Sequence, residues 1–194
     1  MKILIIYCHP NPKSFNHAIK ERAKKKLKDL GHEVRVRDLY ALGFDPALSG
    51  KDFEAIHGGN IPESIRTEQE QIVWSDVMVF VHPVWWTGLP AVLKGYIDRV
   101  FSFGFAYIYK DGQPQGLLNG KKVFIVNTTG SPSEHYEETG MRDALKITSD
   151  IGIYQFCGFE VIDHVFFGAV PSVTDGVRKT YLTDLDRVIE HYFC

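Results

Sequence analysis

Short, uninterrupted runs of apolar residues alternate along this chain with stretches of helical periodicity. Residues 3–7 and residues 77–81 are apolar throughout, as strands buried on both faces of a sheet must be. Apolar residues then recur at helical spacing from Phe15 to Leu30, and Gly31 marks the end of that helix. This alternation predicts an α/β protein with a mostly parallel sheet.

The second predicted strand differs from the others. Over residues 33–39, Val34 and Val36 alternate with Arg35 and Arg37, so one face or edge of this strand meets water. The remaining pattern predicts strands at 123–127 and 161–167 and helices at 89–101, 134–156 and 174–193. We therefore expect one α/β domain over residues 1–194, a three-layer sandwich whose five-stranded parallel sheet has the order 2-1-3-4-5. Ligands bind such sheets at the carboxyl ends of the strands, here in the loops after strands one, three and four.

Bulk properties narrow the function classes. A formal net charge of −2 gives no sign of a nucleic-acid surface. The three cysteines have no paired spacing, which argues against a disulfide framework or zinc site and favours a reducing cytoplasm. No apolar run approaches the roughly 18 residues of a membrane span, so we expect no membrane insertion. The eight histidines lack metal-ligand spacing, and no metal is expected.

The first loop offers a phosphate site without glycine. No glycine precedes Gly31, which excludes both the usual dinucleotide fingerprint and a Walker A loop. His9, Lys13, Ser14 and Asn16 instead lead into a helix N-terminus, where backbone N–H groups and the helix dipole suit a phosphate. The alternative is that Ser14 is only an N-cap and His9 a surface turn residue.

The second loop contains two adjacent tryptophans, Trp85 and Trp86, between a strand and a helix. At the sheet's switch point they could wall a flat heterocycle, with Gly88 letting the chain turn; alternatively, they pack in the core beneath the loop. The aromatic segment 101–109 could roof a pocket for a flat substrate or lie buried at a subunit interface.

The third loop is small and polar. Thr128, Thr129 and Gly130 would let a ligand ring approach the backbone closely, although the threonines could simply cap the next helix. Tyr136 follows and could present its phenol to the same ring.

In the motifs of these three loops, the chain resembles the NAD(P)H:quinone oxidoreductase family of flavodoxin-like proteins. This family includes mammalian DT-diaphorase and bacterial general-stress and potassium-efflux-associated oxidoreductases. Matching segments occur in family order over nearly the whole chain: His9 with residues 14–16, residues 38–40 with Phe44, Pro46 and Asp52, residues 83–95, residues 98–101, residues 105–107, residues 128–130 and residues 157–159.

The resemblance implies a flavodoxin-like fold and a homodimeric, NAD(P)H-dependent flavoprotein that reduces quinones, or nitro or azo compounds, by two-electron, ping-pong hydride transfer. The flavin's phosphate and ribityl region would be held by His9, Lys13, Ser14, Phe15 and Asn16. Its ring would contact Pro83, Val84, Trp85, Trp86, Thr87, Thr128, Thr129 and Gly130. Tyr136 would hydrogen-bond the ring edge, and Tyr107 and Tyr109 would line a substrate pocket completed by the other subunit.

The chain departs from the family pattern after Tyr136. Mammalian members place a histidine shortly after this tyrosine, whereas residues 137–142 contain none; Arg142 could instead stabilise the negative charge that accumulates on reduction. The segment 52–72 is shorter than in FAD-binding relatives, which favours FMN over FAD. Two alternatives stay open: a flavodoxin-like one-electron carrier, and a flavin-bound regulatory partner of a potassium-efflux transporter.

Overall fold

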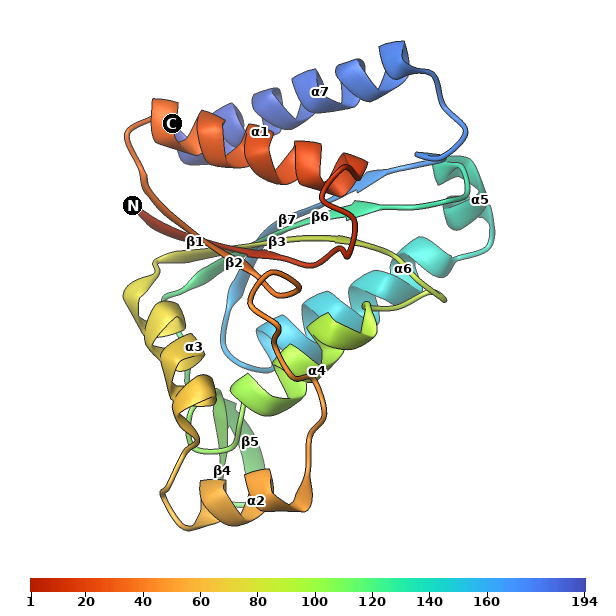
Figure 1. The fold of residues 1–194 in the computed structure, drawn as a ribbon. Coiled ribbons are helices and arrows are strands. Elements are labelled where there is room, and N and C mark those ends of the chain that lie inside the picture. Colours follow the sequence, from red (N-terminus) through yellow and green to blue (C-terminus); the bar gives the residue numbers. More distant parts are fainter.

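The computed structural model describes residues 1–194 and contains one parallel five-stranded sheet (Figure 1). Its order is β2-β1-β3-β6-β7, which confirms the predicted order 2-1-3-4-5 once strands outside this sheet are set aside. Only the edge strand β2 alternates between exposed and partly buried residues, whereas β1 and β3 are almost wholly buried. The strands are β1 (Lys2–Tyr7), β2 (Glu33–Asp38), β3 (Val77–Pro83), β6 (Lys122–Thr128) and β7 (Glu160–Phe167).

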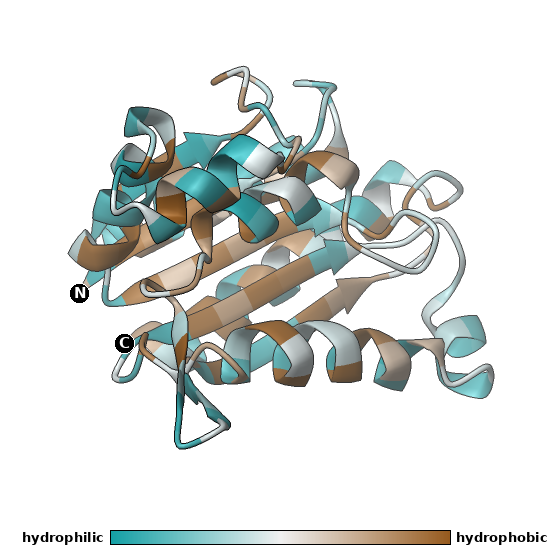
Figure 2. Cartoon of the chain, turned by 90° about the horizontal axis from the view of Figure 1, so that it is seen from below, coloured by the Kyte–Doolittle hydropathy of each residue, from teal (hydrophilic) through white to brown (hydrophobic).

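Helices cover both faces of the sheet, which gives the three layers that were predicted. Helices α1 (Phe15–Asp29) and α7 (Asp175–Phe193) pack on one face, and α3 (Glu63–Trp74), α4 (Ala91–Val100) and α6 (Met141–Lys146) lie on the other (Figure 1). Because strand side chains alternate between faces, the core divides into two apolar clusters, one on each side of the sheet. Figure 2 shows the predominantly hydrophobic strands enclosed between helices in which hydrophilic and hydrophobic residues alternate.

The region predicted as one helix over residues 134–156 is divided into three, so this prediction was wrong in detail. Helix α5 (Ser133–Glu138) ends before Gly140, whose φ of 71° is left-handed, and α6 follows it directly. The chain then continues as a π-helix, η1 (Ile147–Gln155). A left-handed residue interrupts helical hydrogen bonding, and glycine adopts this conformation at little cost.

Four elements, α2, α3, β4 and β5, were not predicted. Helix α2 (Gly50–His57) precedes α3, and a short antiparallel hairpin is formed by β4 (Tyr107–Lys110) and β5 (Gln113–Gly116). The hairpin turns at Asp111 and Gly112, both with positive φ, as a tight two-residue turn requires. In Figure 1 this hairpin and α2 lie together at the end of the molecule away from α5. No helix combines the length and apolar character needed to cross a bilayer.

Candidate functional site

A cavity of about 530 Å³ lies at the carboxyl ends of the central strands. Its walls come from the loops after β1, β3, β6 and β7, so the three loops singled out from the sequence do converge on one site. The lining residues are His9, Asn11, Ser14, Phe15, Asn16, Pro83, Val84, Trp85, Thr128, Thr129, Gly130, Val170 and Pro171.

The first wall is the N-terminus of α1. Ser14 is its N-cap, and the Ser14 hydroxyl oxygen accepts a hydrogen bond from the His17 amide at 3.2 Å. The first two amides of the helix, those of Phe15 and Asn16, donate to nothing within the chain. The first turn of α1 contains no acidic residue. Free N–H groups and the positive end of the helix dipole make this wall suitable for an anion. Ser14 is thus a cap, as the simpler interpretation held, and it also lines the cavity.

The loop before α1 is shaped by its own side chains. The Asn11 carboxamide oxygen accepts from the Lys13 amide at 2.8 Å, and His9 Nδ1 accepts from the Asn11 amide at 3.0 Å. Burial lowers the pKa of His9, although the bond from Asn11 acts in the opposite direction. A neutral His9 that accepts at Nδ1 keeps a hydrogen on Nε2, which remains a free donor at the cavity.

Two walls are joined by a buried hydrogen bond. Asn16 Nδ2 donates to the Thr128 hydroxyl oxygen at 2.7 Å, and both residues are buried. This bond leaves the Asn16 carboxamide oxygen buried without a partner. An unpaired buried acceptor costs about 1–3 kcal/mol, so a ligand hydroxyl that donates to it gains correspondingly.

The turn after β3 is strained. Trp85 and Gly88 exchange two backbone hydrogen bonds of 3.1 Å, while Trp86 and Thr87 between them have φ values of 51° and 53°. The expectation that Gly88 lets the chain turn was wrong, since the two left-handed residues are a bulky aromatic and a β-branched residue. Such conformations cost about 1–3 kcal/mol each and concentrate at functional sites.

The two tryptophans are not core residues. Trp86 is fully exposed and Trp85 is 40% exposed, and the Trp85 ring lies 5.8 Å from the His9 ring, between centroids. The loop therefore presents aromatic surface at the mouth of the cavity. This rules out packing beneath the loop, which was the alternative left open from the sequence.

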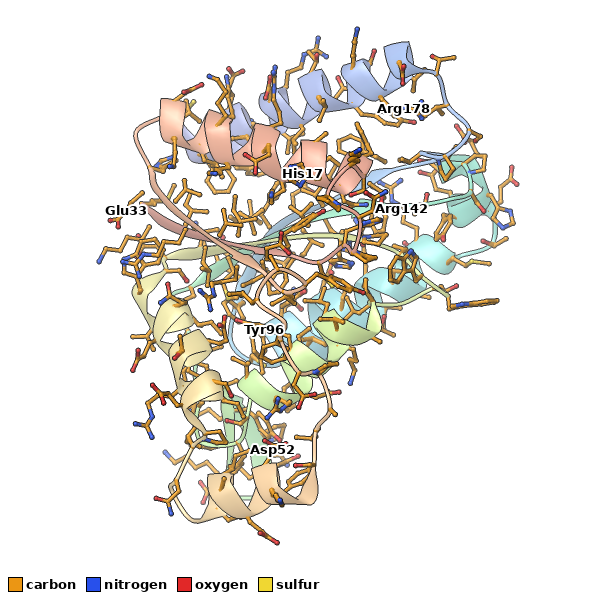
Figure 3. All side chains as sticks on the ribbon, viewed as in Figure 1. His17, Glu33, Asp52, Tyr96, Arg142 and Arg178 are labelled. Carbon is orange, nitrogen blue, oxygen red and sulfur yellow. The ribbon has the colours of Figure 1, made fainter.

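Seven of the predicted residues do not line the cavity within one chain. Tyr136 on α5 is half-buried, and burial raises the pKa of its phenol. Arg142 on α6 forms an ion pair with Glu137, and its guanidinium lies 5.2 Å from the centre of the Phe166 ring (Figure 3). The others are Lys13, Trp86, Thr87, Tyr107 and Tyr109. The last two belong to β4, in the hairpin at the end of the molecule away from the loops (Figure 1).

Sequence reasoning missed part of the site. Val170 and Pro171 follow β7 and line the cavity, because β7 ends beside β6. Their position in the loop after the fifth strand of the sheet could have identified them. His82 and Asn127 line a second cleft of about 370 Å³ with Thr87 and Gly88. In the sequence, each of these two residues could have been recognised as a polar residue at the end of an otherwise apolar strand. No group of three or more potential metal-binding side chains occurs.

The fold and the cavity at its switch point define a flavodoxin-like protein. A family model described as a flavodoxin-like fold matches residues 1–189. A protein of Haemophilus influenzae named an uncharacterized NAD(P)H oxidoreductase is 38% identical, and the match covers 94% of this chain and 91% of that protein. NAD(P)H dehydrogenase (quinone) 1 of Cavia porcellus is 34% identical over 92% of this chain and 70% of its own.

A solved structure agrees with these relatives. NAD(P)H:quinone oxidoreductase from Methanothermobacter marburgensis has a TM-score of 0.87 with 28% identity, over 96% of each chain. The chain belongs to the flavodoxin-like NAD(P)H:quinone oxidoreductase family, which confirms the resemblance found in its motifs.

Proposed function

We propose that this protein is an NAD(P)H-dependent flavoenzyme that reduces quinones by two electrons and holds FMN in the 530 Å³ cavity. The observation that carries the proposal is the strained, exposed turn at Trp86 and Thr87, set beside a cavity with an anion-binding wall. Backbone strain of this kind persists only where surrounding structure holds it in place. The family relationship indicates an NAD(P)H-dependent oxidoreductase, and the residues that line the cavity are of the kinds that would hold a flavin.

The cavity matches the parts of a flavin one by one. The free amides of Phe15 and Asn16 at the N-terminus of α1 would bind the phosphate. The unpartnered Asn16 carboxamide oxygen would accept from a ribityl hydroxyl. The turn after β3 and the Thr128–Thr129–Gly130 backbone would hold the ring between them. Lys13, exposed next to Ser14, would add long-range attraction for the phosphate.

The absence of cover for a second nucleotide favours FMN over FAD. No residue between Asn16 and Pro83 lines the cavity, and α2 lies at the far end of the molecule (Figure 1). The chain therefore offers no element that would shield an adenine half. Identification of the flavin released from the purified protein tests this directly.

A bound flavin supplies the chemistry, accepting hydride from NAD(P)H and passing two electrons to the acceptor. The protein's side chains would orient the substrates and stabilise the negative charge that accumulates on reduction. Trp85 at the cavity and the exposed Trp86 offer apolar rings against which the nicotinamide and the quinone would bind in turn, and the reaction would then be ping-pong. Tyr136 keeps its hydroxyl proton because burial raises the pKa, so it would act as a hydrogen-bond donor. Arg142 would contribute positive charge, moderated by Glu137.

A homodimer would complete this site. Tyr107 packs against Tyr109, Phe103 and Phe156 in an aromatic cluster, and Tyr109 is 61% exposed. This cluster and the exposed Trp86 are separate aromatic surfaces on one chain. In a two-fold dimer Trp86 of each chain would face the aromatic cluster of its partner, so that two equivalent pockets form.

The decisive experiment combines a spectrum with an assay. We expect the purified protein to be yellow, to release FMN on denaturation, and to oxidise NADH or NADPH with menadione as acceptor. A flavin-loaded protein without NAD(P)H oxidation would indicate a one-electron carrier. A protein that is colourless and binds neither FMN nor FAD would contradict the proposal.

A further inference from the structure

A continuous row of buried polar side chains runs beneath the turn after β3. His82 comes from β3, Asn127 from β6, His164 from β7 and Asp150 from η1. Asn127 Nδ2 lies 3.0 Å from His82 Nε2, Asn127 Oδ1 lies 2.8 Å from His164 Nε2, and His164 Nδ1 lies 2.9 Å from Asp150 Oδ1. Each of the four residues is at most 7% exposed. Buried polar side chains in such a row must match donors to acceptors at every link.

The hydrogen at each link is determined from the Pro83 end. His82 Nδ1 lies 3.0 Å from the Pro83 carbonyl oxygen, which can only accept, so the hydrogen is on Nδ1. Burial lowers the pKa of His82 to about 4, which keeps the ring neutral. Its Nε2 is then an acceptor, and the Asn127 amide must donate to it. The Asn127 oxygen consequently faces His164 and requires a hydrogen on His164 Nε2.

The far end of the row holds one more proton. The Ser149 hydroxyl oxygen lies 2.7 Å from Asp150 Oδ1 and 2.8 Å from the Leu145 carbonyl oxygen, and Asp150 Oδ1 also faces His164 Nδ1. Since Nε2 of His164 donates to Asn127, its Nδ1 faces the Asp150 carboxylate at 2.9 Å, and a hydrogen between these two atoms completes the row. The other charged groups that face His164 are Asp163, whose carboxylate accepts from the His164 amide, and Arg142, across the stacked Phe166 ring.

We propose that these four side chains are positioning residues for the flavin-binding turn. The Pro83 carbonyl at one end and the His164–Asp150 pair at the other together set the direction of every hydrogen bond in the row, and the bond at the first end holds the Pro83 carbonyl. The next amide, of Val84, donates to the Thr128 carbonyl at 2.8 Å. The Pro83–Val84 peptide is therefore held on both sides, and only Trp85 separates it from the strained Trp86 and Thr87. This inference rests on the proposed function only in that the turn binds a flavin.

Two features support a functional origin. A row of four buried polar groups across three strands and a helix is expensive to assemble, and apolar residues would fill the same space more simply. Its acidic end lies in η1, a π-helix, and π-helical turns are rare and frequently mark functional sites. The strained turn also needs surrounding contacts that fix it, which this row supplies.

The first test is spectroscopic and requires no activity. In the purified protein labelled with ¹⁵N-histidine, NMR should show the hydrogen of His82 on Nδ1, the minor form in free histidine, and hydrogens on both ring nitrogens of His164. A His82 hydrogen on Nε2, or a single hydrogen on His164, would overturn the proposal. This outcome is independent of flavin binding, so it remains decisive even if the proposed function fails.

The second test asks whether the far end of the row reaches the turn. His164→Leu should weaken FMN affinity about ten-fold and move the His82 hydrogen off Nδ1. His164→Gln, whose amide can still donate to Asn127, should restore both. Tyr154→Phe is the matched control, because Tyr154 is buried like His164, lies in η1 like Asp150, and has a hydroxyl without a partner. Equal FMN affinity in His164→Leu and Tyr154→Phe would refute the coupling; if His164→Leu does not fold, the wild-type NMR result decides.

Discussion

Asn16 and Thr128 lie 112 residues apart in the sequence, yet the Asn16 amide donates to the Thr128 hydroxyl at 2.7 Å. The bond joins the first turn of α1 to the end of β6 and spans β3, which separates β1 from β6 in the sheet. It also orients the Asn16 carboxamide oxygen, which is left without a partner. One side chain thus closes the cavity wall and presents an acceptor to the ligand.

Thr128→Val should lower both stability and flavin affinity. The variant keeps the shape of the side chain but leaves the buried Asn16 amide without an acceptor, which costs about 1–3 kcal/mol. Urea unfolding and FMN titration measure the two effects. Thr180→Val, which removes an exposed helical hydroxyl, is the control and should change neither. In a double-mutant cycle with Asn16→Leu, fully additive losses would show that the bond is unimportant.

Trp86→Asn should separate stability from function. Trp86 is fully exposed and left-handed, and asparagine tolerates that backbone better than tryptophan, so the free energy of unfolding should stay within about 0.5 kcal/mol or rise. The stacking surface is lost, and kcat/KM for menadione should fall about ten-fold or more. Phe53→Gln removes another exposed aromatic and should leave kcat/KM unchanged. An active Trp86→Asn enzyme would contradict the assigned role.

Mixing two impaired variants tests the shared site. One variant carries Tyr107→Ala and Tyr109→Ala, and the other carries Trp86→Asn. If each pocket combines Trp86 of one chain with the tyrosines of its partner, each mixed dimer contains one intact pocket. Co-expression in equal amounts should then restore about a quarter of the wild-type activity. Residual activity equal to the mean of the two pure variants would place all three residues in one chain's pocket, against the proposed dimer.

Acid should destabilise the protein through His82. Its pKa is lowered to about 4 by burial, against an ordinary value of 6.5, so the unfolded chain takes up the proton first as pH falls. The stability is therefore fully present above about pH 6.5 and is lost on the way down to about pH 4, by about 3 kcal/mol. Urea unfolding over this range should show a shallower pH dependence in His82→Leu than in the wild type, whereas exposed His57→Gln should retain the wild-type slope.

Only one thiol should react in the folded protein. Burial raises the pKa of Cys8 to about 12 and that of Cys157 to about 11, whereas Cys194 is exposed. Because the thiolate is the nucleophile, Ellman's reagent should titrate one thiol in the native state and all three in urea. Cys194→Ser should abolish the native reaction. Rapid labelling of Cys8 would mean that the strand before the phosphate loop opens readily.

The sequence by itself determined the sheet. Residues 3–7 and 77–81 are apolar on every position because central parallel strands are covered on both faces, while the alternation around Arg35 and Arg37 marks an edge. Once the strand order is known, the switch point follows, and with it most of the residues that line the cavity. These features are local or periodic, and they can be recognised without knowing which segments touch.

Only the tertiary structure decided how that site is held. No local pattern indicates that Trp86 and Thr87 are left-handed, because the reciprocal bonds of Trp85 and Gly88 and the fixed Pro83 peptide impose it. The row from His82 to Asp150 likewise joins three strands and a helix from separate parts of the sequence. Such contacts depend on distances and donor directions between remote residues, and these exist only once the chain has folded.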